Sequence, residues 1–174
     1  LFVEYDLSIG KVLTPIYKVI IDLAIKEALS RDKSEGNVFF VIDEFKLLPN
    51  LYHIDDGVNF GRSLGAKFIV AMQNIQQIID GYGYEKAHSI LSAFGTSIAF
   101  RVTDKATKEF IQNLYGVNRK RFVYKGVSYS DGNKEQVSYS NVLEDWDLLG
   151  LKTGEAVISI SEYDAAPMKF KFAE

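Results

Sequence analysis

The adjacent carboxylates Asp43 and Glu44 directly follow the apolar run VFFVI at residues 38–42. A carboxylate at the rim of an apolar sheet stays ionised only where a cation or hydrogen-bond donors satisfy it. An apolar strand that ends in Asp-Glu is the Walker B pattern, in which the first acid helps to hold Mg²⁺ through water and the second orients or deprotonates an attacking water. The same two acids could instead cap a following helix, and on these residues alone both interpretations stay open.

A second polar strand end occurs further along the chain. The apolar run KFIVAM at residues 67–72 is followed by Gln73 and Asn74. Ligands of open α/β sheets bind outside the carboxyl ends of the parallel strands, so we expect Gln73 to lie beside Asp43 and Glu44. There its amide could sense a γ-phosphate or position water. The competing interpretation is a helix N-terminal residue without a ligand.

Between the two strand ends, Arg62 lies in the glycine-flanked segment NFGRSLGAK, which we interpret as a turn. A guanidinium presented there could pair with a phosphate, and a surface salt bridge is the competing interpretation. The sequence has no match to G-x-x-x-x-G-K-[ST], the loop that cradles phosphates. These residues alone therefore do not make a complete ATP site.

The elements that must position these groups alternate between strand and helix. Each expected strand is apolar along its whole length, which predicts a mostly parallel α/β sheet covered by helices on both faces. A helix is expected over 14–31, with Thr14 as its N-cap and Pro15 at its first position. The other expected elements are strands at 1–5, 38–42, 66–72 and 96–102, and helices at 55–64, 74–83, 85–94 and 104–116, the last capped by Asp104 and stopped by Gly116.

The pattern changes in the last third of the chain. Residues 119–142 alternate with period two around Asp131 and Gly132, which predicts a β-hairpin. The elements expected after it are a short helical turn and two strands that pair antiparallel and close one edge of the sheet, at 143–151, 155–161 and 168–173.

The stretch NRKRFVYKG at 118–126 interleaves aromatic residues with four positive charges, as proteins that bind single-stranded nucleic acid do. Alternation in a hairpin strand places charges on one face by default. We therefore interpret this stretch as a solvated face of the hairpin.

Composition limits the function classes. The chain has 174 residues, is 47% hydrophobic and carries a formal net charge of −3. We interpret residues 1–174 as one globular domain, without the broad basic surface of a protein that wraps nucleic acid. The absence of cysteine excludes disulfides and thiolate metal sites, and the two histidines lack metal-ligand spacing. No apolar run approaches the roughly 18 residues of a membrane span, so the chain is expected to be soluble. It opens LFVEYDLSIG, without Met, and we expect it to be an excerpt of a longer polypeptide.

The chain resembles the C-terminal part of the ATPase domain of type IV coupling proteins, the hexameric DNA-pumping ATPases of bacterial conjugation and type IV secretion. The resemblance rests on the segments VEYDLSIGKVLTPIYKVIIDLAIKEAL, NVFFVIDEFKLLPNLYHIDDGVNFGRSLGAKFIVAMQNIQQI and the closing residues 137–174. It spans essentially the whole chain. It implies a RecA-like P-loop NTPase fold, with antiparallel strands at the C-terminal end and with the phosphate-binding loop and membrane anchor upstream.

The resemblance also implies roles for the residues singled out above. Asp43 and Glu44 would be the Walker B acids, with Mg²⁺ held by Asp43 through water. Gln73 would link the nucleotide to the moving parts of the motor. Arg62 would be the arginine finger, which reaches the ATP of the neighbouring subunit.

The cofactors implied by the resemblance are ATP and Mg²⁺, and the partners are DNA, a relaxase, type IV secretion channel components and further copies in a homo-hexamer. The parent protein would lie at the cytoplasmic face of the bacterial inner membrane. We expect this chain alone to be inactive as an ATPase and to be monomeric. Two alternatives stay open: a different P-loop motor, such as a helicase or a protein-secretion ATPase, and a non-catalytic interaction module that has lost its phosphate loop.

Overall fold

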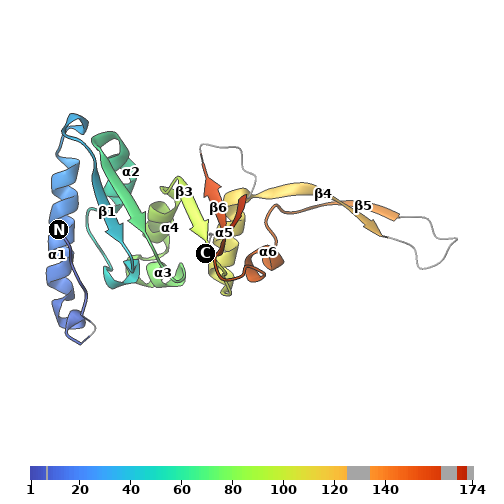
Figure 1. Ribbon diagram of the computed structural model, residues 1–174, viewed down its shortest axis with the longest axis horizontal. Helices are drawn as coiled ribbons and strands as arrows, with labels where there is room; N and C mark the ends of the chain where they lie inside the picture. The colour runs from blue at the N-terminus through green and yellow to red at the C-terminus, as the bar shows by residue number, and fades with distance from the viewer. Residues whose placement is uncertain (7, 125–133, 162–167, 172–174) are drawn as a thin grey trace. The chain divides into compact units, whose positions relative to one another are not determined.

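The computed structural model describes residues 1–6, 8–124, 134–161 and 168–171 (Figure 1). The chain divides into two compact units, Leu1–Phe94 and Gly95–Glu174, which we call the first and the second unit. Each unit is described by itself. The interpretation of residues 1–174 as one domain stays a prediction.

The first unit is built on two parallel strands, β1 and β2, joined by a crossover helix. Their register pairs Val38 with Ala66 at one end and Ile42 with Val70 at the other, as the apolar strand pattern predicts. The elements of this unit are α1 (Gly10–Leu29), the 3₁₀ turn η1 (Lys33–Glu35), β1 (Val38–Ile42), the 3₁₀ turn η2 (Phe45–Leu47), α2 (Ile54–Leu64), β2 (Ala66–Val70), α3 (Gln76–Tyr82) and α4 (Tyr84–Ser92).

The start of the chain differs from expectation in two respects. Residues 1–6 form no strand, because the Tyr5 ring packs on α1, 5.5 Å from the ring of Tyr17. Helix α1 begins at Gly10, so the predictions of Thr14 as N-cap and Pro15 at the first position are wrong. Thr14 lies within the helix and its hydroxyl donates to the Gly10 carbonyl at 2.9 Å.

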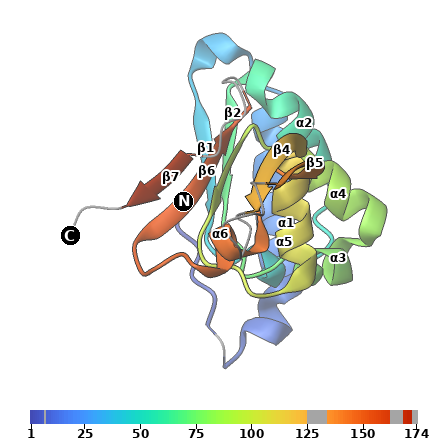
Figure 2. The same cartoon turned by 90° about the vertical axis from the view of Figure 1, so that its right-hand side faces the viewer.

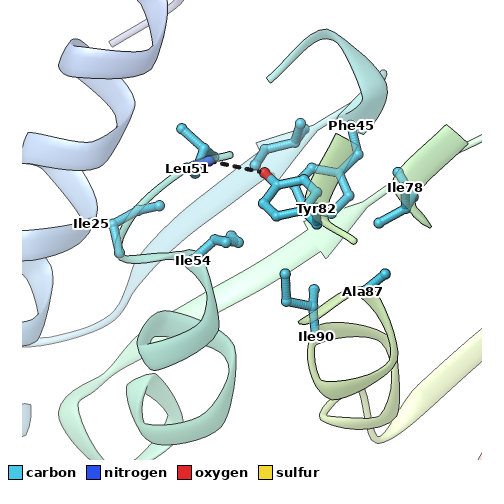
Figure 3. Packing of buried hydrophobic residues seen from close by; sticks show 9 residues of the cluster. Ile25, Phe45, Leu51, Ile54, Ile78, Tyr82, Ala87 and Ile90 are labelled. Carbon is cyan, nitrogen blue, oxygen red and sulfur yellow. Dashed lines mark hydrogen bonds between the residues drawn. The ribbon is translucent and has the colours of Figure 1, made fainter. Parts of the chain in front are cut away.

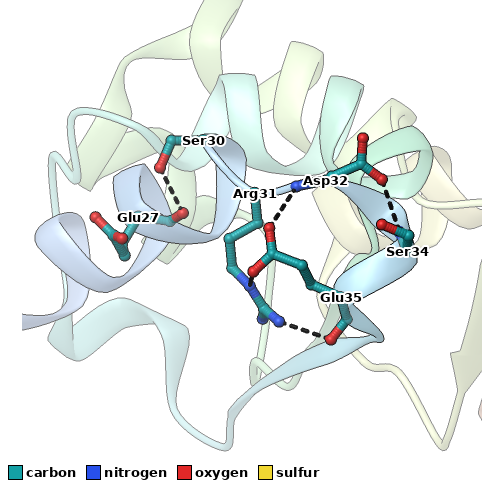
Figure 4. A network of polar contacts seen from close by, with 6 residues as sticks. All are labelled: Glu27, Ser30, Arg31, Asp32, Ser34 and Glu35. Carbon is teal, nitrogen blue, oxygen red and sulfur yellow. Dashed lines mark hydrogen bonds and ion pairs between the residues drawn. The ribbon is translucent and has the colours of Figure 1, made fainter.

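A polar turn leads from α1 towards β1 (Figure 4). The Arg31 guanidinium donates to the Glu35 carbonyl at 2.8 Å and pairs with its carboxylate at 3.3 Å. The other Glu35 oxygen accepts from the Asp32 N–H, and the Asp32 carboxylate accepts from the Ser34 N–H. These contacts fix the path by which the chain enters the sheet.

The core of the first unit lies on one face of the β1–β2 pair (Figure 3). Inward residues Phe40 and Phe68 stack at 4.8 Å and pack against buried residues of all four helices. On the other face, Phe39, Val41 and Ile69 are 63%, 69% and 56% exposed. The expectation that helices cover both faces is therefore not met by this pair, because the helices of the first unit all contribute to the same core.

The second unit combines an antiparallel sheet, two helices and a hairpin. Strand β6 pairs antiparallel with both β3 and β7, and Figure 2 shows β6 beside β7. The mixed α/β fold with C-terminal antiparallel strands agrees with the predicted class. The elements are β3 (Thr96–Ala99), α5 (Lys105–Tyr115), β4 (Val117–Tyr124), β5 (Lys134–Asn141), α6 (Asp145–Leu149), β6 (Glu155–Ile160) and β7 (Met168–Lys171).

Two local predictions in the second unit are confirmed. Asp104 caps α5 by accepting a hydrogen bond from the Thr107 N–H at 2.9 Å, and the helix stops at Gly116, whose φ is 68°. The hairpin forms between β4 and β5 with eight paired residues on each strand. Its predicted turn at Asp131 and Gly132 lies outside the described residues.

Candidate functional site

Asp43 and Glu44 lie at the carboxyl edge of the parallel pair, where sequence reasoning places them. Two backbone hydrogen bonds bracket the acids, because Ala71 donates its N–H to the Ile42 carbonyl at 2.8 Å and its carbonyl accepts from the Phe45 N–H at 3.0 Å. The Asp43 side chain is exposed, and Glu44 is partly buried. The end of β2 thus holds the acid pair at the edge of the sheet.

The carboxylate of Glu44 meets Gln73, the residue that we expected from the next strand. The Gln73 amide donates to Glu44 Oε2 at 3.4 Å. The ammonium of Lys46 lies 3.8 Å from Oε1. Among the described residues, Oε1 is buried and has no hydrogen-bond partner. Because an unsatisfied buried carboxylate oxygen is costly, this atom is suited to a further donor, such as a positioned water.

Phe45 anchors the acid pair in the core of the first unit. Its ring is fully buried and stacks on Tyr82 at 5.3 Å (Figure 3). The Tyr82 hydroxyl donates to the Leu48 carbonyl at 2.5 Å and accepts from the Leu51 N–H at 3.4 Å, and burial raises the pKa of this phenol. The segment that follows the acids is therefore tied to α3 by one side chain.

The two polar residues at the end of β2 have different tasks. The Asn74 side-chain oxygen accepts a hydrogen bond from the Gln77 N–H at 3.0 Å, in the first turn of α3. Gln73 points to Glu44 instead. The competing interpretation of Gln73, a residue at the start of a helix, thus describes Asn74 instead.

Arg62 lies in the last turn of α2, so the prediction of a turn around it is wrong. Of the two glycines that suggested a turn, Gly61 serves packing, because a Cβ there would lie 3.0 Å from the Ala66 Cβ, and Gly65 ends the helix with a φ of 85°. Earlier in the helix, a Cβ on Gly57 would lie 2.7 Å from the Phe68 ring. Helix α2 leads into the start of β2, and the strands extend about 13 Å from there to the acid edge at ~3.3 Å per residue. The structure therefore places Arg62 at the opposite edge from the acids.

Sequence reasoning missed two residues that shape the site. Lys46 follows the acids by two or three positions and pairs with Glu44, and its signal was the cation within the apolar FKLL segment. Asp22 of α1 accepts hydrogen bonds from the Tyr52 and His53 N–H groups at 2.9 and 3.0 Å. It fixes the start of α2, and its signal was a single acid within the apolar run IIDLAI.

The acid pair could supply one or two carboxylate ligands to a metal ion. Within the described ranges, no group of three or more histidine or acidic side chains could hold a metal ion. Mg²⁺ at phosphate sites uses only one or two carboxylates, together with water and phosphate oxygens. An exposed Asp43 beside a partly buried Glu44 fits that pattern.

No helix in the described part of the chain is long and apolar enough to cross a membrane.

Comparison with protein-family models matches residues 1–158 to the type IV secretion-system coupling protein DNA-binding domain. A comparison with curated proteins finds no match. Among solved structures, the fold is similar to the bacterial conjugative coupling protein TrwBdeltaN70 in its unbound monoclinic form, with a TM-score of 0.80 and 19% identity over 95% of this chain and 39% of that chain. It is also similar to the plasmid coupling protein TrwB in complex with the ATP analogue ADPNP, with a TM-score of 0.75 and 20% identity over 94% of this chain and 37% of that chain. For TrwB in complex with ADP and Mg²⁺, the TM-score is 0.73 and the identity is 19%, over 94% of this chain and 37% of that chain. The chain thus spans less than two fifths of the length of these structures.

Proposed function

Because the chain belongs to the family of type IV secretion-system coupling protein DNA-binding domains, we propose that it carries the water-activating side of an ATP-hydrolysing site in a DNA-translocating motor of bacterial conjugation. The contact between Glu44 and Gln73, at the carboxyl edge of parallel strands, carries this proposal. The likeness to TrwB, which was solved with ADPNP and with ADP and Mg²⁺, supports a nucleotide as the ligand.

In this proposal the two acids have separate tasks, set by their surroundings. A bound Mg²⁺ would neutralise charge that develops on the phosphates. The exposed carboxylate of Asp43 would hold the ion through water. Glu44, fixed by Gln73 and Lys46, would orient the attacking water through Oε1, which has no hydrogen-bond partner among the described residues. Gln73 would then respond to the γ-phosphate and pass its loss to β2 and α3.

Arg62 is proposed to complete the site of a neighbouring subunit. Its place at the opposite edge of the strands supports a role in trans, since its own acids lie about 13 Å further along the sheet at ~3.3 Å per residue. A guanidinium supplied in trans stabilises the charge that develops on the transferring phosphoryl group. The proposal therefore requires a ring, which we infer to be a homo-hexamer.

The proposal extends to the longer protein of which this chain would form the C-terminal part of the ATPase domain. Its phosphate-binding loop would come from upstream residues, and its partners would be DNA, a relaxase and components of the type IV secretion channel. The motor would work at the cytoplasmic face of the inner membrane. The family description supports DNA as a partner.

The test is ATP hydrolysis by the longer protein, with and without DNA, compared with its Glu44→Gln variant. Loss of a general base or water-orienting carboxylate lowers turnover by about 100-fold or more, so we expect the DNA-stimulated rate to fall by that factor. Glu85→Gln is the matched control, because Glu85 is an exposed acid in the first turn of α4. Circular dichroism checks that both variants fold.

Three results would overturn the proposal. Equal rates of ATP hydrolysis for wild type and Glu44→Gln would show that Glu44 takes no part in the reaction. Absence of hydrolysis in the wild type would favour a non-catalytic interaction module. Hydrolysis that depends on Glu44 but is indifferent to DNA would instead favour a different P-loop motor.

A further inference from the structure

The β4–β5 hairpin has two faces with different surroundings. The register places Arg119 and Arg121 on the same face as Tyr139 and Val137 of the partner strand, with Tyr139 directly opposite Arg119. All four side chains are exposed or partly exposed, Tyr139 by 77%. Figure 1 shows the hairpin as a long ribbon that leads away from α5 and α6 of its own unit. We call this side of the ribbon the arginine face.

The opposite face is tied to the second unit at its base. Lys120, which lies between the two arginines in sequence, pairs with Glu144 Oε1 at 2.6 Å. Glu144 also belongs to the capping box that starts α6, and its hydrogen bond with Lys120 lowers the pKa of its carboxyl. Lys120 is thus neutralised within the unit, whereas the side chains of the arginine face are exposed.

The charge of the ribbon is opposite to that of the chain. On the arginine face the register places two cations, Arg119 and Arg121, and one acid, Glu135, which gives +1, whereas the whole chain is −3. Arg121 lies 3.4 Å from Glu135, but both side chains are mostly exposed and such a pair is weak. The arginine face is therefore complementary to a polyanion.

Shape and side-chain chemistry select the polyanion. A two-stranded ribbon fits the major groove of duplex DNA, and its cations contact phosphates without regard to sequence. An exposed tyrosine flanked by arginines is also a stacking platform for an unpaired base. We propose that the arginine face of the β4–β5 hairpin is a DNA-contacting surface, with Arg119 and Arg121 on phosphates and Tyr139 against bases. This inference rests on the proposed function, which supplies DNA as the partner.

The experiment measures DNA binding by fluorescence anisotropy without nucleotide, with the longer protein and a labelled duplex or single strand. Arg119→Gln/Arg121→Gln removes two phosphate contacts, which lowers the salt slope on duplex DNA by about 1.8, at ~0.9 per contact. Between 50 and 200 mM salt, the variant would therefore lose about 12-fold less affinity than the wild type. Lys11→Gln/Lys105→Gln, two exposed cations outside the hairpin, is the control with equal charge change and should keep the wild-type slope.

Tyr139 gives a second, independent measurement. Tyr139→Ala should weaken single-strand binding about tenfold or more, whereas Tyr139→Phe, which keeps the ring, should bind like the wild type. Because binding is measured without nucleotide, its outcome does not depend on Glu44.

Three results would overturn the inference. If the double-arginine variant keeps the salt slope of the wild type, Arg119 and Arg121 do not contact phosphates. The proposed function still stands in that case, provided that the wild type binds DNA. No DNA binding by the wild type refutes the proposed function as well. If the variant binds DNA normally but changes its mass in sedimentation, the arginine face contacts another copy of the chain.

Discussion

The Tyr82 hydroxyl offers the sharpest test of how the acid pair is held. It bonds the Leu48 carbonyl at 2.5 Å and the Leu51 N–H at 3.4 Å, on the segment that follows Glu44. Tyr82→Phe keeps the ring stacked on Phe45 but leaves the partly buried Leu48 carbonyl and the buried Leu51 N–H without this partner. A buried polar group that loses its partner costs about 1–3 kcal/mol, and we expect the first unit to lose that amount.

The measurement is urea and thermal unfolding followed by far-ultraviolet circular dichroism, which is dominated by the four α-helices of the first unit. For a unit of this size, each kcal/mol corresponds to about 4–8 °C in Tm. Tyr84→Phe is the matched control, because this tyrosine on the neighbouring helix is exposed. Its stability should stay within about 0.5 kcal/mol of the wild type.

The same hydroxyl predicts an alkaline pH dependence. Burial raises the pKa of Tyr82 above its ordinary value of 10.0. Above pH ~10 the unfolded chain releases this proton while the native unit retains it, so native stability is complete below that pH and falls above it. Tyr82→Phe should lack this part of the loss. A Tyr82→Phe variant as stable as the Tyr84→Phe control, with an unchanged alkaline profile, would refute the account of the anchor.

Further predictions address the other elements. Arg62→Ala and Glu44→Gln subunits of the longer protein, each inactive, should regain part of the ATPase rate when mixed; a mixture as inactive as its parts would exclude action in trans. Gly57→Val should destabilise the first unit by about 1–3 kcal/mol in urea, because an added Cβ meets a β2 ring at 2.7 Å. The Lys120 hydrogen bond lowers the pKa of Glu144, so the second unit should lose stability as pH falls through that lowered pKa, and Glu144→Gln should remove this loss in acid titrations followed by tryptophan fluorescence.

The site was predictable where strand order alone decides position. Parallel strands end at the same edge of a sheet, so the contact between Glu44 and Gln73 follows from two apolar runs and the polar residues after them. The helices and the hairpin were also predictable, because their patterns depend on residues close together in the sequence. Asp104 caps α5, as expected for an aspartate at the start of a helix.

What could not be predicted depends on contacts between distant residues. Gly61 and Gly65 suggested a turn around Arg62, yet Gly61 is small because α2 packs closely on β2, and Gly65 ends the helix only after Arg62. Pro15 suggested a helix start, but α1 begins at Gly10, where the Tyr5 ring packs. The bonds from Asp22 to the segment before α2 join residues about thirty positions apart, and local patterns do not report such pairs.

The uncovered face of the β1–β2 pair has a practical consequence for work with this chain. Phe39, Val41 and Ile69 form an exposed apolar surface, and among the described residues β1 and β2 pair with no further strand. Surfaces of this kind are adhesive in water and promote association through stacked or edge-paired sheets. We expect the chain prepared by itself to scatter light increasingly with concentration, so its colloidal behaviour must be established before any of its binding curves is interpreted.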